Sequence, residues 1–238
     1  MSELFSIQLQ NRQQQGRDGV WLDLPTTTEQ VQAALRQIGI SSDNPQGLFI
    51  SGYFAEEEKR FAIPYNMVLA SNVDELNFLA SRLETLSTGE RAELNAALQA
   101  PQSELFSIGR ITDFPENVDY YVHLPDVRGP AQLGDYYLNR SGMVDMPEEW
   151  KGGIDTAQFG RYVAQQEQGA FTQYGYLVKS GDEWQKVHEG QPVPEEYRVL
   201  SFPVPEVMRD AANIPPPVQP ETEPQKVIPI ILNGKDSA

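Results

Sequence analysis

The N-terminal part of the chain alternates apolar and polar positions in a way that predicts a small sheet with one helix. Residues 4–9 alternate with a period of two, and residues 19–25 resume that period, which predicts two strands around a Gln-rich turn. Residues 31–38 carry apolar side chains at helical spacing after threonines that can cap a helix. Residues 47–53 are typical of a third strand. We therefore expect a first domain over residues 1–65.

The next segment has the pattern of a helical hairpin. Apolar side chains recur on one helical face over residues 73–86, and Asn72 in front of them can serve as an N-cap. Ser87 and Glu90 have the spacing of a capping box, which predicts the start of another helix. We expect a second, helical domain over residues 66–101.

Strands and helices alternate again in the third part of the chain. The pattern predicts a strand at residues 120–124, helices at residues 131–140 and 156–166, and one closing strand at residues 171–178. We expect a third domain over residues 102–180. The fold class is then α+β, a chain of three small domains.

Beyond residue 180 the chain becomes rich in proline, which prevents long regular elements. Residues 181–238 are therefore expected to form a C-terminal extension that is partly disordered, with residues 213–226 as a linker. Residues 227–232 form an apolar island around Pro229. A loosely attached tail, a docking peptide and an edge strand are all compatible with this island.

Charge is the strongest feature of the composition. The chain has 34 acidic and 18 basic residues, a net charge of -16 and a sequence pI of about 4.5. Such a charge repels nucleic acids and anionic membranes and attracts basic surfaces, so we expect no direct binding to nucleic acid or membrane. Many cytoplasmic proteins are also acidic simply to remain soluble, and composition alone does not separate the two explanations.

The sequence also restricts the compartment. The chain has no cysteine, which excludes disulfides and thiolate metal sites and fits a reducing compartment. Its N-terminus lacks a basic region followed by an apolar run, and no apolar run approaches the length of about 18 residues that a membrane span needs. We expect a soluble, cytoplasmic protein.

Residues for catalysis are scarce. The two histidines, His123 and His188, have no metal-ligand spacing, and the GxSxG, Walker A, GxGxxG and HExxH signatures are missing from the sequence. A hydrolase built on carboxylates would need a metal ion. We expect no enzymatic activity, no cofactor and no metal site.

The acidic residues are spread along the chain and not gathered in one tail. Carboxylates fixed on ordered elements can imitate the phosphates of a duplex, which carries one charge per about 1.7 Å of its axis. A solvated acidic surface has the same appearance in sequence, so mimicry of DNA is a hypothesis at this point. The acids that we assign to it are Glu56, Glu57, Glu58, Asp74, Glu75, Glu84, Glu90, Glu93, Asp113, Glu116, Asp119, Asp126 and Asp135.

One segment of the third part resembles the antirestriction motif of ArdA-type antirestriction proteins. It consists of residues 142–150 (GMVDMPEEW), followed by Ile154-Asp155 and by Phe159-Gly160-Arg161. Other segments resemble the family in the same order. These are the Gly-x-Trp strand at residues 19–25, a helical segment at residues 74–80, a Leu-Gly-x-Tyr step at residues 133–136 and a strand around Gly175-Tyr176.

The resemblance implies an elongated, curved homodimer that imitates bent B-form DNA and occupies the DNA channel of type I restriction-modification enzymes. It also implies carriage on a conjugative element. The resemblance also places the motif in part of the family's subunit interface. The motif residues that it assigns are Val144, Asp145, Met146, Pro147, Glu148, Glu149, Ile154 and Asp155.

The motif also departs from the family pattern and allows other interpretations. Residues 151–156 lack the family's aromatic residue before the Ile and its Tyr after the Asp, which affects the dimer contact or inhibition and not the fold. A purely local explanation is a bend at Pro147, a helix start, and packing of Trp150. A rival function is an acidic interaction module of a mobile element that binds another basic partner, for example through residues 227–232.

Overall fold

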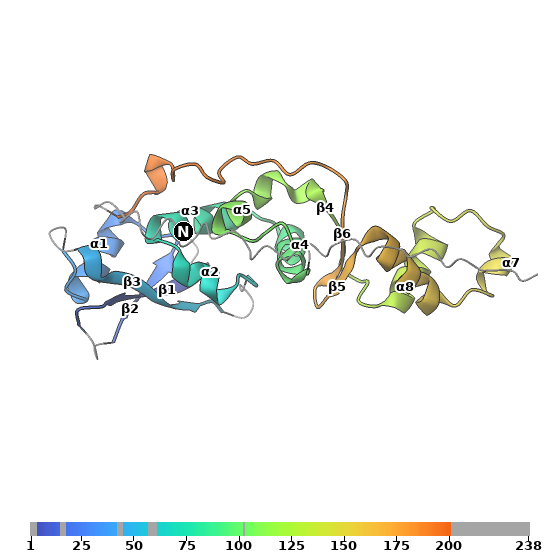
Figure 1. Ribbon diagram of the computed structural model, residues 1–238, viewed down its shortest axis with the longest axis horizontal. Coiled ribbons are helices and arrows are strands. Elements are labelled where there is room, and N and C mark those ends of the chain that lie inside the picture. The colour runs from blue at the N-terminus through green and yellow to red at the C-terminus, as the bar shows by residue number, and fades with distance from the viewer. Residues whose placement is uncertain (1–3, 15–17, 42–44, 57–60, 102, 201–238) are drawn as a thin grey trace, which may run out of the picture.

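The computed structural model describes residues 4–14, 18–41, 45–56, 61–101 and 103–200. These residues form an α+β fold with eight α-helices and two three-stranded antiparallel sheets. Figure 1 shows an elongated molecule, with one sheet at one end, helices in the middle, the second sheet beyond them, and further helices at the other end. The predicted fold class is confirmed.

The first sheet has the strand order β2-β1-β3. β1 (Phe5–Asn11) pairs with both β2 (Val20–Leu24) and β3 (Leu48–Phe54), and its alternate residues are buried against α1 (Thr28–Gln37) and the helices behind it. Thr27 and the residue three positions later form a capping box at the start of α1. The predicted hairpin, helix and third strand are confirmed.

Helices dominate the middle of the molecule. α2 (Tyr65–Ala70) begins directly after a proline and was not predicted, because six residues are too short for a helical period to stand out. α3 (Val73–Glu84) and α4 (Thr88–Gln99) form the predicted hairpin. Both predicted caps are confirmed, since the side chains of Asn72 and Ser87 each accept a hydrogen bond from the backbone three residues later.

The second sheet has the order β4-β6-β5, and it corrects one prediction. β4 (Tyr121–Leu124) is the predicted strand, preceded by α5 (Ile108–Thr112) and two short 3-10 turns. The single strand expected over residues 171–178 is wrong: β5 (Ala170–Thr172) and β6 (Gly175–Lys179) form a hairpin. Gly175 lies at φ +132, which lets the chain reverse where alternation alone suggested continuity.

The far end of the molecule consists of helices. α6 (Pro130–Asp135) continues into one π-helical turn (Tyr136–Arg140), and α8 (Thr156–Glu167) lies beside α6. α7 (Glu148–Lys151) is one short turn in the loop between them (Figure 1). The two helices predicted from periodicity are therefore present.

Buried apolar side chains form two clusters. The large cluster runs without a break from Leu4 to Tyr121 and also contains Leu177 and Val199. The small cluster surrounds Leu133 at the far end. The large cluster therefore has members on both sides of residues 65 and 101.

The first part of the expected C-terminal extension is ordered. Residues 181–200, which we call the strap, leave β6 and run back along the helices towards the first sheet, ending in a 3-10 turn (Glu195–Tyr197) near that end (Figure 1, orange). The expected linker at residues 213–226 and the apolar island at residues 227–232 lie outside the described residues.

Two glycines allow α6 and α8 to approach closely. A Cβ atom on Gly134 would lie 1.9 Å from the carbonyl oxygen of Thr156, and one on Gly160 would lie 1.8 Å from that of Pro130. Backbone atoms cannot move aside as a flexible side chain can. Gly134 and Gly160 belong to two separate segments that resemble the family, and the structure brings those segments together.

Replacing Gly134 with Ala should lower the free energy of unfolding by about 1 to 3 kcal/mol or more, because the helices must separate. Denaturant unfolding followed by circular dichroism measures this loss. Gly89→Ala is the matched control, since nothing lies within 4 Å of a Cβ at this helical position, and it should leave stability unchanged or slightly higher. Equal effects of the two substitutions would contradict the packing argument.

Candidate partner-binding surface

The acids assigned to DNA mimicry occupy different environments. Four of them are exposed and come from separate parts of the fold: Glu56, Glu84, Asp119 and Asp126. They follow β3, end α3, lie before β4 and follow β4, respectively. Glu57 and Glu58 lie outside the described residues.

Two further acids cap helices. The carboxylates of Glu75 and Glu90 accept hydrogen bonds from the backbone N–H groups of Asn72 and Ser87. The hydrogen bonds from the Ser87 side chain and backbone lower the pKa of Glu90, so this carboxylate keeps its charge. Such caps place negative charge at helix N-termini, where the helix dipole stabilises it.

Two others are paired with arginine. Glu116 accepts a hydrogen bond from Arg82, and Asp135 accepts one of 2.6 Å from Arg140. The guanidinium groups cancel part of the field of these carboxylates. The pairing therefore reduces what Glu116 and Asp135 contribute to attracting a basic partner.

Asp113 does not belong to the surface. Its side chain is fully buried, and its two oxygens accept hydrogen bonds from the backbone N–H groups of His188 and Glu189 at 2.6 and 3.2 Å. Asp74 is half-buried and accepts similar bonds from Val199 and Leu200. The assignment of Asp113 to an exposed row of charges is wrong, because its carboxylate accepts its hydrogen bonds inside the molecule.

Glu93 is also a poor imitation of a phosphate. Burial, followed by the nearby charges of Glu90 and Asp119, raises the pKa of Glu93 from an ordinary 4.5 to about 8. Its Oε1 atom is buried without a hydrogen-bond partner among the residues that the structure describes. At neutral pH most Glu93 side chains therefore carry a proton.

The segment that resembles the antirestriction motif lies in the loop between the far helices. Pro147 precedes α7, and Glu148 and Glu149 occupy its first turn with exposed side chains. Asp155 caps α8 by accepting hydrogen bonds from the N–H groups of Ala157 and Gln158 at 2.9 and 3.0 Å. Asp145 is exposed, while Val144, Met146 and Ile154 are partly buried.

Large apolar side chains are exposed around this segment. Met143, Trp150 and Tyr162 are 75%, 66% and 60% exposed. The expectation that Trp150 packs within its own subunit is therefore wrong. Met143 and Tyr162 were not assigned from sequence, because helical spacing cannot distinguish an apolar residue that faces the core from one that faces a partner.

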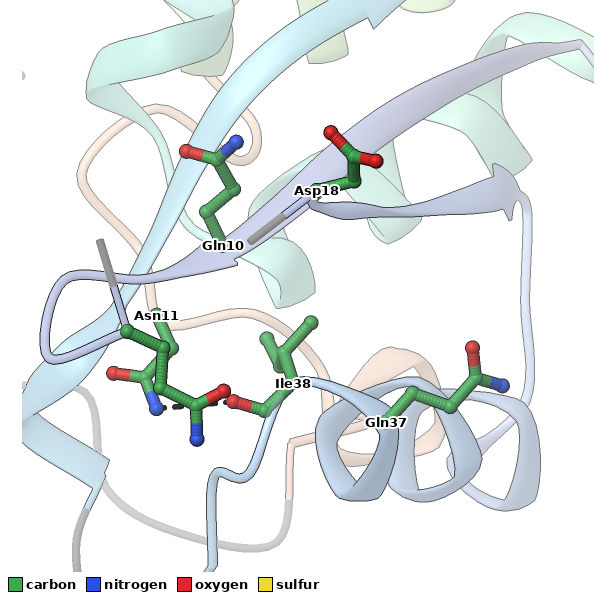
Figure 2. A pocket seen from close by; sticks show the side chains of 6 residues that line it. Gln10, Asn11, Asp18, Gln37 and Ile38 are labelled. Carbon is green, nitrogen blue, oxygen red and sulfur yellow. Dashed lines mark hydrogen bonds between the residues drawn. The ribbon is translucent and has the colours of Figure 1, made fainter. Parts of the chain in front are cut away.

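The described residues also line one small hollow. The hollow shown in Figure 2 lies between β1 and the end of α1 and measures about 20 Å³, room for roughly one water molecule. It is lined by Gln10, Asn11, Gln14, Asp18, Gln37 and Ile38. Among all the residues that the structure describes, no three His, Asp or Glu side chains are arranged to hold a metal ion. No helix among them is long and apolar enough to cross a membrane.

A sequence profile described as antirestriction protein (ArdA) matches residues 15–178, well over half of the chain. The chain belongs to the ArdA antirestriction protein family. A search of curated proteins gives no match.

The family match covers all of the helices from α1 to α8 and the strands from β2 to β5 with nearly all of β6, whereas β1 precedes it. Membership indicates interaction with restriction-modification enzymes as the general activity. The strap begins just beyond the matched region, so its contacts are additional to what the family profile describes.

Glu93 should make stability depend on pH. In the unfolded chain the pKa of Glu93 is ordinary, whereas in the folded protein it is raised. The contribution of Glu93 to the free energy of unfolding is therefore fully present below about pH 4 and is lost as pH rises through about 8. Glu93→Gln should therefore stabilise the protein at pH 9 by about 1 to 2 kcal/mol, a value reduced for partial solvent screening.

Denaturant unfolding at pH 5, 7 and 9 measures this effect, with Glu149→Gln as a control at an exposed position. The difference between Glu93→Gln and the unchanged protein should grow with pH. A difference that is constant from pH 5 to 9 would show that Glu93 titrates normally.

Proposed function

We propose that this ArdA family member is a DNA mimic that occupies the DNA-binding channel of a type I restriction-modification enzyme. The observation that supports this most is the distribution of exposed carboxylates along an elongated molecule with a net charge of -16. A DNA channel is positively charged and long, and such a surface complements it in both respects.

The exposed acids come from elements along the whole long axis. Glu56 follows a strand of the first sheet, Asp126 follows a strand of the second, and Glu149 lies on α7 at the far end (Figure 1). Phosphates are likewise distributed along a duplex. Since the field is the sum of many carboxylates, no single acid is expected to dominate binding.

The proposed active form is a homodimer joined at the far end. Met143, Trp150 and Tyr162 expose apolar surface there, and contact with a second copy would remove this surface from water. Such a dimer would double the length of the acidic surface. The departures from the family pattern at residues 151–156 concern this contact.

Inhibition by mimicry needs no chemical step, so the protein would act without catalysis or cofactor. Restriction-modification enzymes act on DNA in the cytoplasm, and we propose that the protein works there. A mobile, conjugative element is the proposed carrier, because newly entered DNA is what such an inhibitor protects.

The purified protein should compete with duplex DNA for a type I methyltransferase at low salt, and competition should weaken as salt rises, because ions screen the charges. Competition measured by fluorescence anisotropy of labelled DNA from 50 to 300 mM salt tests this. Failure to compete at low salt would exclude the proposal.

A rival function, binding of another basic partner through residues 227–232, is tested in the same assay. A chain ending at residue 200 should compete as well as the full chain if the mimic is right. Loss of all binding in this shorter chain would favour the rival.

Trp150→Ala should shift the monomer–dimer equilibrium towards monomer by about tenfold or more, because burial of an exposed aromatic ring is lost. Analytical ultracentrifugation over a concentration series measures the shift. Trp21→Ala is the matched control, since Trp21 is also half exposed but lies on the first sheet. An unchanged dimer in Trp150→Ala would show that the subunits meet elsewhere.

A further inference from the structure

The strap, residues 181–200, is held by hydrogen bonds between its backbone and side chains of the helical part of the molecule. It follows β6 and runs along α5 and α3 to the region of the first sheet (Figure 1). It lies outside the region that matches the ArdA profile. Three of the groups that hold it, on Asp113, Asn117 and Asn77, belong to buried residues.

One set of contacts lies near the second sheet. The side chain of Asn117 donates to the carbonyl oxygen of Gln185 at 2.9 Å and accepts from its N–H at 2.7 Å. Asp113 accepts hydrogen bonds from the strap backbone a few residues later, at the partly buried His188 and Glu189. Without the strap, the buried Asp113 charge would lose both donors, which is costly in a protein interior.

A second set of contacts lies near the first sheet. Asp74 accepts hydrogen bonds from the N–H groups of Val199 and Leu200 at 2.7 and 2.8 Å. The amide of Asn77 donates to the carbonyl oxygen of Tyr197 at 3.0 Å and accepts from the N–H of Thr26 at 2.7 Å. Asn77 therefore links the strap to the segment that leads into α1.

Aromatic side chains also anchor the strap near each of these two sets. Trp184 packs edge-on against Tyr120, with ring centroids 5.1 Å apart. Phe78 contacts the rings of His188 and Tyr197 at 5.0 and 4.7 Å. These contacts cover part of the ring of Phe78, which is buried.

The far end of the molecule has few other connections to the rest. The chain enters it through β4 and returns through β5 and β6, so the second sheet is its main attachment (Figure 1). A narrow sheet can bend and twist. A third connection that starts at the end of β6 and is fixed to α5 and α3 restricts this motion.

We propose that the strap is a brace that fixes the angle between the far end and the rest of the molecule, with Trp184 and Tyr197 as its anchors. It thereby sets the spacing of carboxylates at the two ends without touching a partner. The effect on inhibition rests on the proposed function, whereas the mechanical role does not.

Distance measurements between spin labels test the brace. Because the chain has no cysteine, Arg36→Cys on α1 and Gln165→Cys on α8 give two unique labels at exposed positions. Dilution with unlabelled protein removes distances between subunits. The full chain and a chain ending at residue 200 should both give one narrow distance distribution.

Trp184→Ala combined with Tyr197→Ala should broaden this distribution at least about twofold, with unchanged circular dichroism and faster hydrogen exchange at the amides of Gln185, His188 and Val199. Trp21→Ala combined with Phe54→Ala, an exposed aromatic pair on the first sheet, is the control and should remain narrow. A chain ending at residue 180 should be at least as broad as the anchor variant. If this shorter chain does not fold, the anchor variant decides.

A narrow distribution in the anchor variant would overturn the brace, whether or not its amides exchange faster. Competition with DNA is measured in parallel, and the anchor variant should compete about tenfold less well. Broadening without loss of competition would support the brace and remove its link to inhibition. If the full chain itself does not compete, the proposed function fails while the distances still decide the brace.

Discussion

Repulsion among its own carboxylates is the constraint on which this structure depends. A chain with a net charge of -16 is stable only if its buried apolar surface outweighs this repulsion and its charges lie far apart. The elongated shape meets both demands, because one continuous cluster runs from Leu4 to Tyr121 while the exposed acids are distributed over the length of the molecule. A more compact fold would bring the same charges closer together.

The acids divide into those that act outwards and those that build the molecule. Glu56, Glu84, Asp119 and Asp126 face solvent, whereas Asp113 and Asp74 bind backbone N–H groups of the strap. Glu93 is largely neutralised by a proton. Counting acidic residues therefore overestimates the charge that a partner meets, and the fold decides which carboxylates contribute.

Sequence patterns predicted the regular elements well. The alternation in β1 and β2 and the capping residues Asn72 and Ser87 are local features, so the chain itself reveals them. The reversal at Gly175 was missed because an uninterrupted apolar pattern does not show where a strand ends.

The ordered strap was missed because its attachment depends on Asp113 and Asn117. These residues are distant in the sequence, where their side chains look like ordinary surface groups. The exposure of Trp150 was missed for a related reason, since an aromatic residue gives no sign of whether its contact lies within one subunit or between two.

The manner in which the strap is attached has a consequence for how this segment can vary. Asp113, Asn117 and Asp74 recognise peptide groups, which every residue except proline can supply as donors. Most strap positions can thus be substituted, provided that the residues whose N–H groups donate are not replaced by proline. The evolutionary restriction falls on the receiving side chains and on the anchoring rings of Trp184 and Tyr197, so a related chain with an otherwise dissimilar tail could keep the same path if it retains those acceptors and anchors.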